Sequence, residues 1–266
     1  MICEKITSRN NPLIKDTAKL SDKKYRENEG LFAFEGRKLL SEAISSGAPL
    51  LRVFATEKAM PEVQRLSPCC PVYPVSDEVY EKISFEKSPE GIFYVSKPLD
   101  KYHNIYIIYR REDFSEGSVF MLDGIRDPGN LGTVLRTASA FGCKTVVLSS
   151  DCADVYNPKT VRASMGAVFR QRTVRVTDTV ATVKELQAAG KRVYAAALDK
   201  SSVSLFDLKA DQCVCFIVGN EGNGIRPELI KACDGSVIIP MEENTESLNA
   251  AVASTVLLYE QYRLRK

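Results

Sequence analysis

Apolar and polar residues follow two different spacings along this chain, and each spacing predicts one kind of element. Short apolar runs are typical of strands, whereas apolar residues three and four apart are typical of amphipathic helices. In residues 31–98 the two patterns alternate after a polar first segment that predicts a short helix and a loop. They predict helices at 37–47 and 76–84, with strands at 32–36, 50–56, 71–75 and 91–97. We therefore expect a small α/β domain over residues 1–98.

The second half of the chain is more regular. A strand at 118–123, an apolar helix ending near Gly142 and a strand at 144–150 predict a βαβ unit, and hence a parallel pair of strands. The later apolar runs predict buried parallel strands. These further elements are helices at 157–169, 178–190 and 247–263 and strands at 173–176, 192–198, 213–220 and 236–240. We expect a second α/β domain over 118–266, with 99–117 as a linker.

Composition narrows the class of protein. Hydrophobic residues make up 44% of the chain and charged residues 26%, which is typical of a globular protein. No apolar run is long enough to span a membrane, and the polar N-terminus lacks a signal region, so we expect a cytoplasmic protein without a membrane partner. The eight cysteines form no C-x-x-C pair and His103 is the one histidine, so the sequence predicts no metal site.

The charge is nearly balanced overall, with a net charge of +2, but it is uneven locally. Residues 157–177 contain five basic and no acidic side chains, and the first 26 residues contain seven basic and three acidic ones. Such segments are typical of surfaces that contact nucleic-acid phosphates, although they also occur as ordinary solvated faces. The candidate RNA contacts are Arg9, Arg26, Lys159, Arg162, Arg170 and Arg172.

Three unusual loops each follow a predicted strand and precede a helix. They are residues 123–130, 219–224 and 240–249. Ligands bind at the carboxyl ends of parallel strands, so the three loops predict one composite site. The glycines at 219–224 have the spacing G-x-x-G-x-G after a late strand, which does not match the dinucleotide-binding pattern. "FGCKT" at 141–145 lacks the earlier glycine of a phosphate-binding loop and precedes a strand, so it is excluded too.

The helix after the first loop presents an arginine beside its apolar face. Arg136 lies one turn after Gly132, and helical side chains lean toward the N-terminus, which directs Arg136 toward Asn130. The small Gly132 leaves room for a ligand there, and free N–H groups at a helix start favour negative charge. The alternative is a turn with a helix cap and a solvated arginine. The apolar face is formed by Leu131, Val134, Leu135, Ala138 and Phe141.

Taken in order, the three loops resemble the signature motifs of the SpoU (TrmH-type) RNA ribose 2′-O-methyltransferases. Similar residues also occur at "VRASMGAVFR" and along the N-terminal half, so the resemblance covers nearly the whole chain. The first motif is matched by Asn130, Gly132, Arg136, Thr137, Ala138 and Gly142, and the second by Gly219, Glu221, Gly222 and Gly224. The third is matched by Ile239, Pro240, Met241, Ser247, Leu248, Asn249 and Ala253.

The resemblance implies a fold and a chemistry. The C-terminal domain would be a parallel-sheet trefoil-knot (SPOUT) domain that binds S-adenosylmethionine, and the N-terminal domain would bind RNA. Family members are homodimers, and a last helix that is apolar on several sides fits burial against a partner. By resemblance the catalytic residues are Asn130, Arg136, Glu221, Ser247 and Asn249. The cofactor-binding residues are Ala197, Leu198, Gly219, Ile239, Met241 and Leu248.

Several points stay open at the level of sequence. Glu243 stands where the family usually has glycine, which changes the third loop. Guanidinium resists deprotonation, so Arg136 acts either as a base or as an electrostatic stabiliser of the attacking oxygen. The N-terminal pattern resembles members that modify ribosomal RNA, with transfer RNA, a non-catalytic RNA-binding protein and a dinucleotide-dependent oxidoreductase as alternatives. We also expect residues from about Ser118 onward to fold and bind the cofactor alone.

Overall fold

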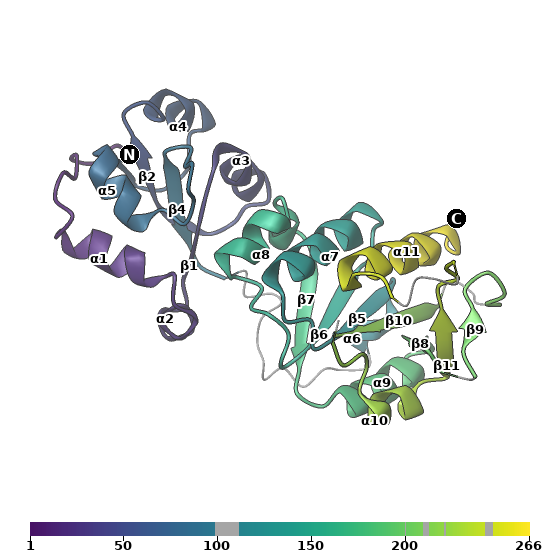
Figure 1. The fold of residues 1–266 in the computed structure, drawn as a ribbon. Helices are drawn as coiled ribbons and strands as arrows, with labels where there is room; N and C mark the ends of the chain where they lie inside the picture. The colour runs from purple at the N-terminus through teal and green to yellow at the C-terminus, as the bar shows by residue number, and fades with distance from the viewer. Residues whose placement is uncertain (99–111, 200, 210–212, 221, 243–246) are drawn as a thin grey trace. The chain divides into compact units, whose positions relative to one another are not determined.

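The computed structural model describes residues 1–98, 112–199, 201–209, 213–220, 222–242 and 247–266. Contacts within the chain divide it into two compact units. The first comprises Met1–Asp100 together with Asp154–Arg170, and the second comprises Lys101–Ala153 together with Gln171–Lys266. Each unit is built around its own sheet (Figure 1).

The N-terminal unit contains a four-stranded mixed sheet in the order β1–β4–β2–β3. Strand β4 is antiparallel to both of its neighbours, and β2 runs parallel to β3. All four strands match the predicted ones. Their bounds are β1 Phe32–Glu35, β2 Leu50–Thr56, β3 Val72–Val75 and β4 Ile92–Ser96.

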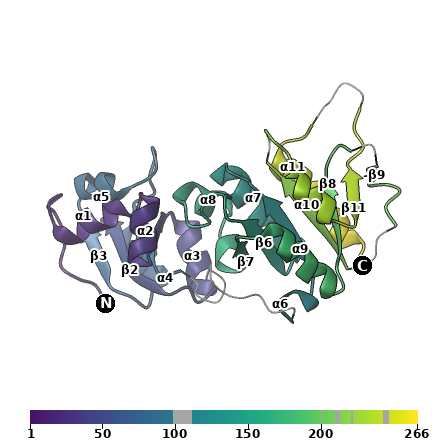
Figure 2. The same cartoon turned by 90° about the horizontal axis from the view of Figure 1, so that it is seen from below.

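Alternate residues of each strand point to opposite faces of this sheet, and helices cover the apolar side chains there. Helices α1 and α5 lie side by side in both views (Figures 1 and 2), and their Ile14, Val79 and Ile83 share an apolar core with Phe54 and Phe93 of the sheet. The sequence predicted α3 and α5 but missed the short α4, and it predicted one helix where α1 and α2 stand. The bounds are α1 Pro12–Lys19, α2 Lys23–Glu29, α3 Arg37–Ser45, α4 Met60–Leu66 and α5 Asp77–Ile83.

The segment 154–170 packs onto strand β1, although the sequence predicted it as part of the second domain. The ring of Tyr156 stacks on Phe32 with centroids 4.2 Å apart, and Phe169 lies 5.0 Å from Phe34. The predicted helix at 157–169 is in fact interrupted, since Met165 and Gly166 have φ of 51° and 90°. Its two parts are α8 Pro158–Ala163 and the 3-10 helix η1 Ala167–Phe169.

The C-terminal unit contains a seven-stranded sheet in the order β7–β6–β5–β10–β8–β11–β9, and every neighbouring pair is parallel. The central strands β5, β6 and β10 are almost completely buried, as their uninterrupted apolar runs predicted. The bounds are β5 Val119–Asp123, β6 Thr145–Ser149, β7 Arg172–Val176, β8 Arg192–Ala196, β9 Val203–Ser204, β10 Val214–Gly219 and β11 Gly235–Ile238.

Helices lie on both faces of this sheet (Figure 1). Helix α11 packs along α7 and against β10 on one face, while α9 contacts α10 and α6 on the other. The buried amide of Gln261 in α11 donates hydrogen bonds of 2.8 Å to the carbonyl oxygens of Val119 and Val214, which fixes the last helix to two central strands. The bounds are α6 Glu112–Ser115, α7 Pro128–Ala140, α9 Thr179–Ala188, α10 Pro227–Ala232 and α11 Ala250–Arg263.

The structure describes only part of the segment that was predicted to link the two domains. Most of the predicted linker, 99–111, lies outside the described residues, and the remainder contains the short helix α6. Within the described ranges, no helix has the length and hydropathy needed to cross a bilayer.

Candidate active site

The three predicted loops begin at one edge of the C-terminal sheet. Strands β5 and β10 are neighbours, and their registers pair Asp123 with Gly219, so the first two loops start side by side. The third loop follows β11, which is separated from β10 only by β8. The expected convergence of the loops at the carboxyl edge is therefore confirmed.

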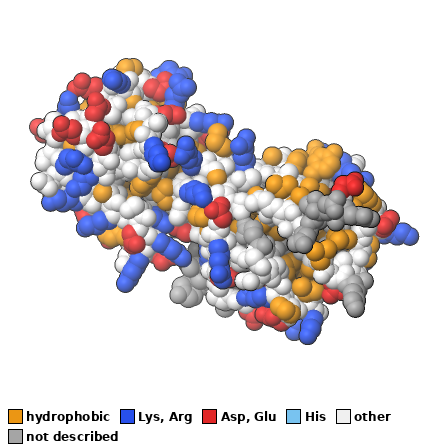
Figure 3. All heavy atoms as spheres, in the orientation of Figure 1, with side chains coloured by type: hydrophobic (Ala, Val, Ile, Leu, Met, Phe, Trp, Pro, Cys, Tyr) orange, Lys and Arg blue, Asp and Glu red, His pale blue; other side chains and the backbone are white. Residues whose placement is uncertain are grey.

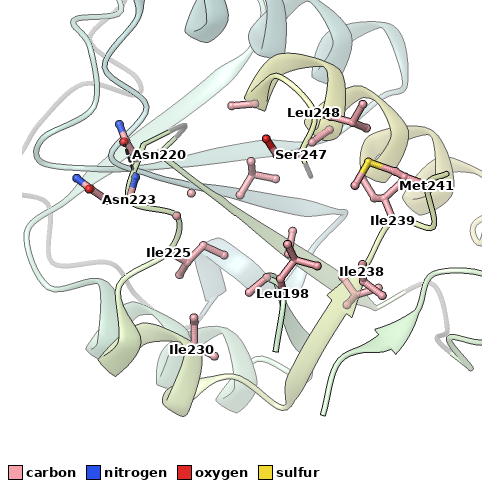
Figure 4. Close-up of a pocket in the computed structure, with 18 residues that line it drawn as sticks. Leu198, Asn220, Asn223, Ile225, Ile230, Ile238, Ile239, Met241, Ser247 and Leu248 are labelled. Carbon is pink, nitrogen blue, oxygen red and sulfur yellow. Dashed lines mark hydrogen bonds between the residues drawn. The ribbon is translucent and has the colours of Figure 1, made fainter. Parts of the chain in front are cut away.

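A cavity of about 400 Å³ opens between the second and third loops (Figure 4). A cavity of this volume is in the range typical of small-molecule sites. It is lined by all six residues that the resemblance assigned to the cofactor and by Ser247 of the predicted catalytic set. The six are Ala197, Leu198, Gly219, Ile239, Met241 and Leu248.

The cavity is apolar along most of its wall and polar at one end. Asn220 and Asn223 lie at one end, and Ile239, Met241 and Leu248 lie at the other (Figure 4). Small side chains of α11 also line the wall and leave space for a ligand; they are Ala250 and Ala253. Since no described lining residue carries a charged side chain, a ligand here is held by apolar contacts, amides and backbone groups.

The glycines of the second loop permit a very tight turn. The N–H of Asn220 donates to the carbonyl oxygen of Gly224 at 3.1 Å, and the N–H of Gly224 donates back at 2.9 Å. A Cβ atom at Gly219 would lie 2.4 Å from backbone atoms of Gly224 and Ile225. Residue 219 is therefore glycine because the backbone crosses itself closely there. Glu221, predicted as catalytic, lies outside the described residues.

The first loop ends in a capped helix start. Asp127 is the N-cap of α7, and its carboxylate accepts a hydrogen bond of 2.8 Å from the N–H of Asn130. Asn130 thus lies in the first turn, and Arg136 lies further along the helix with an exposed side chain. The structure gives the Arg136 guanidinium no hydrogen-bond or ion-pair partner among the described residues. Arg136 does not line the cavity.

The third loop brings a second asparagine to the first one. Asn249 is the N-cap of α11, and its Oδ1 accepts hydrogen bonds from the N–H groups of Ala251 at 2.9 Å and Val252 at 3.3 Å. Its Nδ2 donates to Oδ1 of Asn130 at 3.2 Å. The predicted helix at 247–263 therefore begins later than expected, and Ser247 lies before it. Glu243 lies outside the described residues.

The structure also contains an ion pair at the site, between Asp123 and Arg226, that was not among the residues predicted from the sequence. Asp123, only 2% exposed, ends β5 and accepts hydrogen bonds from the backbone N–H of Arg226 at 3.2 Å and from its Nε at 3.0 Å. The hydrogen bond with Asp123 raises the pKa of Arg226. An acidic residue at the end of a fully buried strand is the one signal in the sequence that indicates such a partner.

The predicted RNA contacts all lie outside the cavity, and one of them is corrected. Arg26 is 4% exposed, and its guanidinium donates to Asp154 at 2.6 Å and to the carbonyl oxygens of Leu20 and Ser21 at 2.8 Å. Arg26 therefore holds the N-terminal unit together and does not reach a ligand, because its polar atoms are already bonded inside the protein.

The remaining predicted RNA contacts differ in their surroundings. Arg162 pairs with Glu86, and Arg170 pairs with Glu42, so acidic residues distant in sequence balance part of the basic run. Arg9 and Lys159 are exposed, and Arg172 is half-buried in β7. Among the residues that the structure describes, no cluster of His, Cys, Asp and Glu could hold a metal ion.

Comparison with known proteins identifies the family. The sequence model of the SpoU rRNA Methylase family matches residues 117–259, and that of the MRM3-like substrate binding domain matches residues 11–93. The chain belongs to the SpoU rRNA methylase family. It is therefore an S-adenosylmethionine-dependent RNA ribose 2′-O-methyltransferase, and its C-terminal unit has the knotted SPOUT fold of its structural neighbours.

Three relatives illustrate the extent of the similarity. The chain is 31% identical to the 23S rRNA (guanosine(2553)-2′-O)-methyltransferase RlmP of Bacillus subtilis, over 96% of this chain and 98% of that protein. It is 32% identical to the 23S rRNA (uridine(2479)-2′-O)-methyltransferase of Streptomyces viridochromogenes, over 98% and 92%. The AdoMet-bound rRNA methyltransferase of Sinorhizobium meliloti superposes with a TM-score of 0.85, at 29% identity over 98% of both chains.

Proposed function

We propose that this enzyme methylates the 2′-hydroxyl of one nucleotide in the RNA of the large ribosomal subunit. The proposal rests on one observation, which is that loops from several strand ends together build the site. The second and third loops, with the end of β8, form a cavity for the cofactor, and next to it the first and third loops bring Asn130 and Asn249 into direct contact. Two relatives named as 23S rRNA methyltransferases match the chain along almost its whole length, including the N-terminal unit.

The identity of the methylated base is a separate question. The two relatives are similar to this chain at 31% and 32% identity, yet one is named for guanosine and the other for uridine. This fits a reaction centre that acts on the ribose, which is common to all nucleotides. We propose that selection of the nucleotide depends on surfaces outside the catalytic loops.

The cavity fits S-adenosylmethionine in size and in chemistry. Leu198, Ile239, Met241 and Leu248 offer apolar contacts, while Ala197 and Gly219 leave space beside the backbone. S-adenosylmethionine supplies an electrophilic methyl group on a sulfonium. The residues of this chain hold the two reactants in line, and positioning of this kind contributes about 7–11 kcal/mol to catalysis in favourable cases.

Arg136 serves as an electrostatic stabiliser in this proposal. Its side chain is exposed outside the cavity, and a guanidinium group keeps its proton in proteins. A permanent positive charge stabilises the negative charge that develops on the attacking ribose oxygen and holds a neighbouring phosphate. The proton of the hydroxyl leaves to another acceptor, such as water or a phosphate oxygen.

The other predicted catalytic residues orient the reacting groups. Asn249 fixes the amide of Asn130 through its Nδ2, and Ser247 contributes a hydroxyl to the cavity wall. We assign Glu221 and Asn249 to substrate orientation on the basis of the family motifs.

The N-terminal unit is proposed to bind the RNA, with Arg9, Lys159, Arg162 and Arg170 as phosphate contacts, and Arg172 of β7 in the C-terminal unit is proposed as a further one. Lys and Arg side chains are interspersed with Asp and Glu on its visible face (Figure 3). The working form is proposed to be a cytoplasmic homodimer.

The decisive experiment maps 2′-O-methyl groups in ribosomal RNA from cells with and without this protein. One position in the large-subunit RNA is expected to lose its methyl group in the deletion strain and to regain it when the gene is restored. Purified enzyme with S-adenosylmethionine is expected to restore the same position in RNA from the deletion strain. A loss confined to transfer RNA, or no loss although the protein binds RNA, would contradict the proposal.

A further inference from the structure

The second catalytic loop is joined at both ends to the turn that follows strand β5. At its beginning, Nδ2 of Asn220 donates to the carbonyl oxygen of Gly124 at 2.8 Å. At its end, Arg226 donates to the carboxylate of Asp123 through its backbone N–H at 3.2 Å, its Nε at 3.0 Å and also its Nη2. Two neighbouring residues of the first loop therefore hold both ends of the second loop.

The carboxylate of Asp123 lies in surroundings that are otherwise unfavourable for a charge. It is 2% exposed at the end of a strand whose other residues are apolar and fully buried. A buried charge is costly unless it is paired and hydrogen-bonded, and the described partner that meets this need is Arg226. A pair of this kind adds little net stability compared with apolar packing, so its consequence lies in the geometry that it imposes.

The ion pair lies between the loop that lines the cofactor cavity and the helix that carries two of the predicted catalytic residues. Asn220, Asn223 and Ile225, in the loop before Arg226, line the cofactor cavity. Three residues after Gly124, Asp127 caps helix α7, which carries Asn130 and Arg136. Asp123 and Gly124 therefore join the second-loop side of the cavity wall to the turn that begins the catalytic helix.

We propose that Asp123 and Arg226 are positioning residues for methyl transfer. Their ion pair fixes the loop that lines the cofactor cavity against the turn that begins the catalytic helix. The reaction requires the ribose oxygen, the methyl carbon and the sulfur to be nearly collinear, and a misplacement of about 1 Å costs on the order of a hundredfold in rate. Neither residue contacts the reacting atoms in this assignment.

The test uses the full-length enzyme with Asp123→Asn, Arg226→Gln and Arg226→Lys. Arg226 is the safer position because its side chain is 41% exposed, so its variants are expected to fold. The measurements are the dissociation constant of S-adenosylmethionine, the single-turnover rate at saturating cofactor and RNA, the KM for RNA and the melting temperature. Arg192→Ala is the matched control, because this exposed arginine lies at the opposite, amino end of the sheet.

Asp123→Asn and Arg226→Gln are expected to lower the single-turnover rate at least tenfold and to weaken cofactor binding at least threefold. The KM for RNA is expected to stay within twofold, and Arg226→Lys is expected to recover part of the rate. The two changes combined are expected to cost no more than the worse single change, since both remove one interaction. A purely structural pair would lower the melting temperature while leaving the rate and cofactor affinity within twofold at 25 °C, and that result would overturn the proposal.

The cofactor measurement is independent of the RNA substrate. Binding of S-adenosylmethionine can be measured on the protein alone, so it remains a test even where the proposed ribosomal substrate is wrong. Unchanged cofactor affinity in both Asp123→Asn and Arg226→Gln would count against this inference and leave the proposed function untouched.

Discussion

At the scale of single residues, we expect different side chains near the cavity to serve cofactor binding and methyl transfer. Arg136 is exposed on α7 and is absent from the cavity wall. Arg136→Ala is expected to lower the methyl-transfer rate more than tenfold, a cost above about 1.4 kcal/mol, because the developing charge on the oxygen loses its stabiliser. Calorimetry is expected to show a cofactor dissociation constant within twofold of wild type. A variant that keeps more than a tenth of the rate would remove Arg136 from the catalytic set.

Asn249 has two functions that one substitution can separate. Its Oδ1 caps helix α11, and its Nδ2 donates to Asn130. Asn249→Asp retains the cap acceptor but faces Asn130 with an oxygen, so we expect a stability close to wild type and at least a tenfold loss of rate. Asn249→Ala removes both functions and is expected to cost about 1 kcal/mol of stability as well. Urea unfolding and single-turnover kinetics measure the two effects; full activity in Asn249→Asp would refute the role of its donor.

At the scale of elements, helix α11 buries one side and exposes another that is also apolar. Val252 and Tyr259 are 49% and 54% exposed, and the Tyr259 ring packs edge-on against Phe141, the residue that follows α7, with ring centroids 5.6 Å apart. Apolar side chains are gathered on the face of the C-terminal unit that carries this helix (Figure 3). We propose that the same face of a second copy covers this surface, since adjacent exposed apolar residues mark interaction sites.

Charge placed on this face is expected to separate the subunits. Val252→Asp and Tyr259→Asp should each shift the mass in light scattering from dimer toward monomer at micromolar concentration, because the contact would bury an unpaired carboxylate. Phe206→Asp is the control, as Phe206 is 85% exposed and follows β9 on another part of the unit. A wild-type protein that is already monomeric at this concentration would contradict the dimer.

At the scale of the whole molecule, the division into units changes the expectation for a C-terminal fragment. Residues 118–266 were expected to fold alone, but Tyr156 and Phe169 within them are buried against Phe32 and Phe34. A fragment beginning at Ser118 would expose these rings. We now expect it to melt at a lower temperature than the full chain and to bind an apolar dye, in thermal scans of both proteins. A fragment that melts like the full chain would show that these ring contacts contribute little.

A single substitution tests how tightly the segment 154–170 packs in the full chain. Gly166 has φ of 90°, and a Cβ there would lie 2.6 Å from Cγ of Glu42. Gly142 has φ of 63° with nothing within 4 Å of its Cβ position. Both Gly→Ala changes therefore strain the backbone, but only Gly166→Ala also forces the segment 154–170 away from α3. In urea unfolding, Gly166→Ala is expected to lose at least about 1 kcal/mol more stability than Gly142→Ala, which is roughly the cost of overpacking a core. Equal losses in the two variants would contradict the tight fit of Gly166 against Glu42.

The sequence by itself determined most elements and the three loops of the site. Strands such as β5 and β10 are apolar throughout because they are buried on both faces, so their pattern does not depend on the rest of the fold. The glycines at 219–224 and the asparagines at 130 and 249 were also recognisable, since tight turns and helix starts require particular residues. The family motifs were therefore visible before the fold was known.

Only the tertiary structure decided which distant residues meet. Arg26 was predicted to contact RNA, yet it binds Asp154, 128 positions later, and Arg162 and Arg170 pair with acids of the N-terminal unit. The segment 154–170 joined the N-terminal unit for the same reason, and Asp123 found its partner in Arg226. A local pattern records whether a residue is buried or exposed, but the partner of a buried charge or ring depends on the path of the whole chain, which no short stretch of sequence contains.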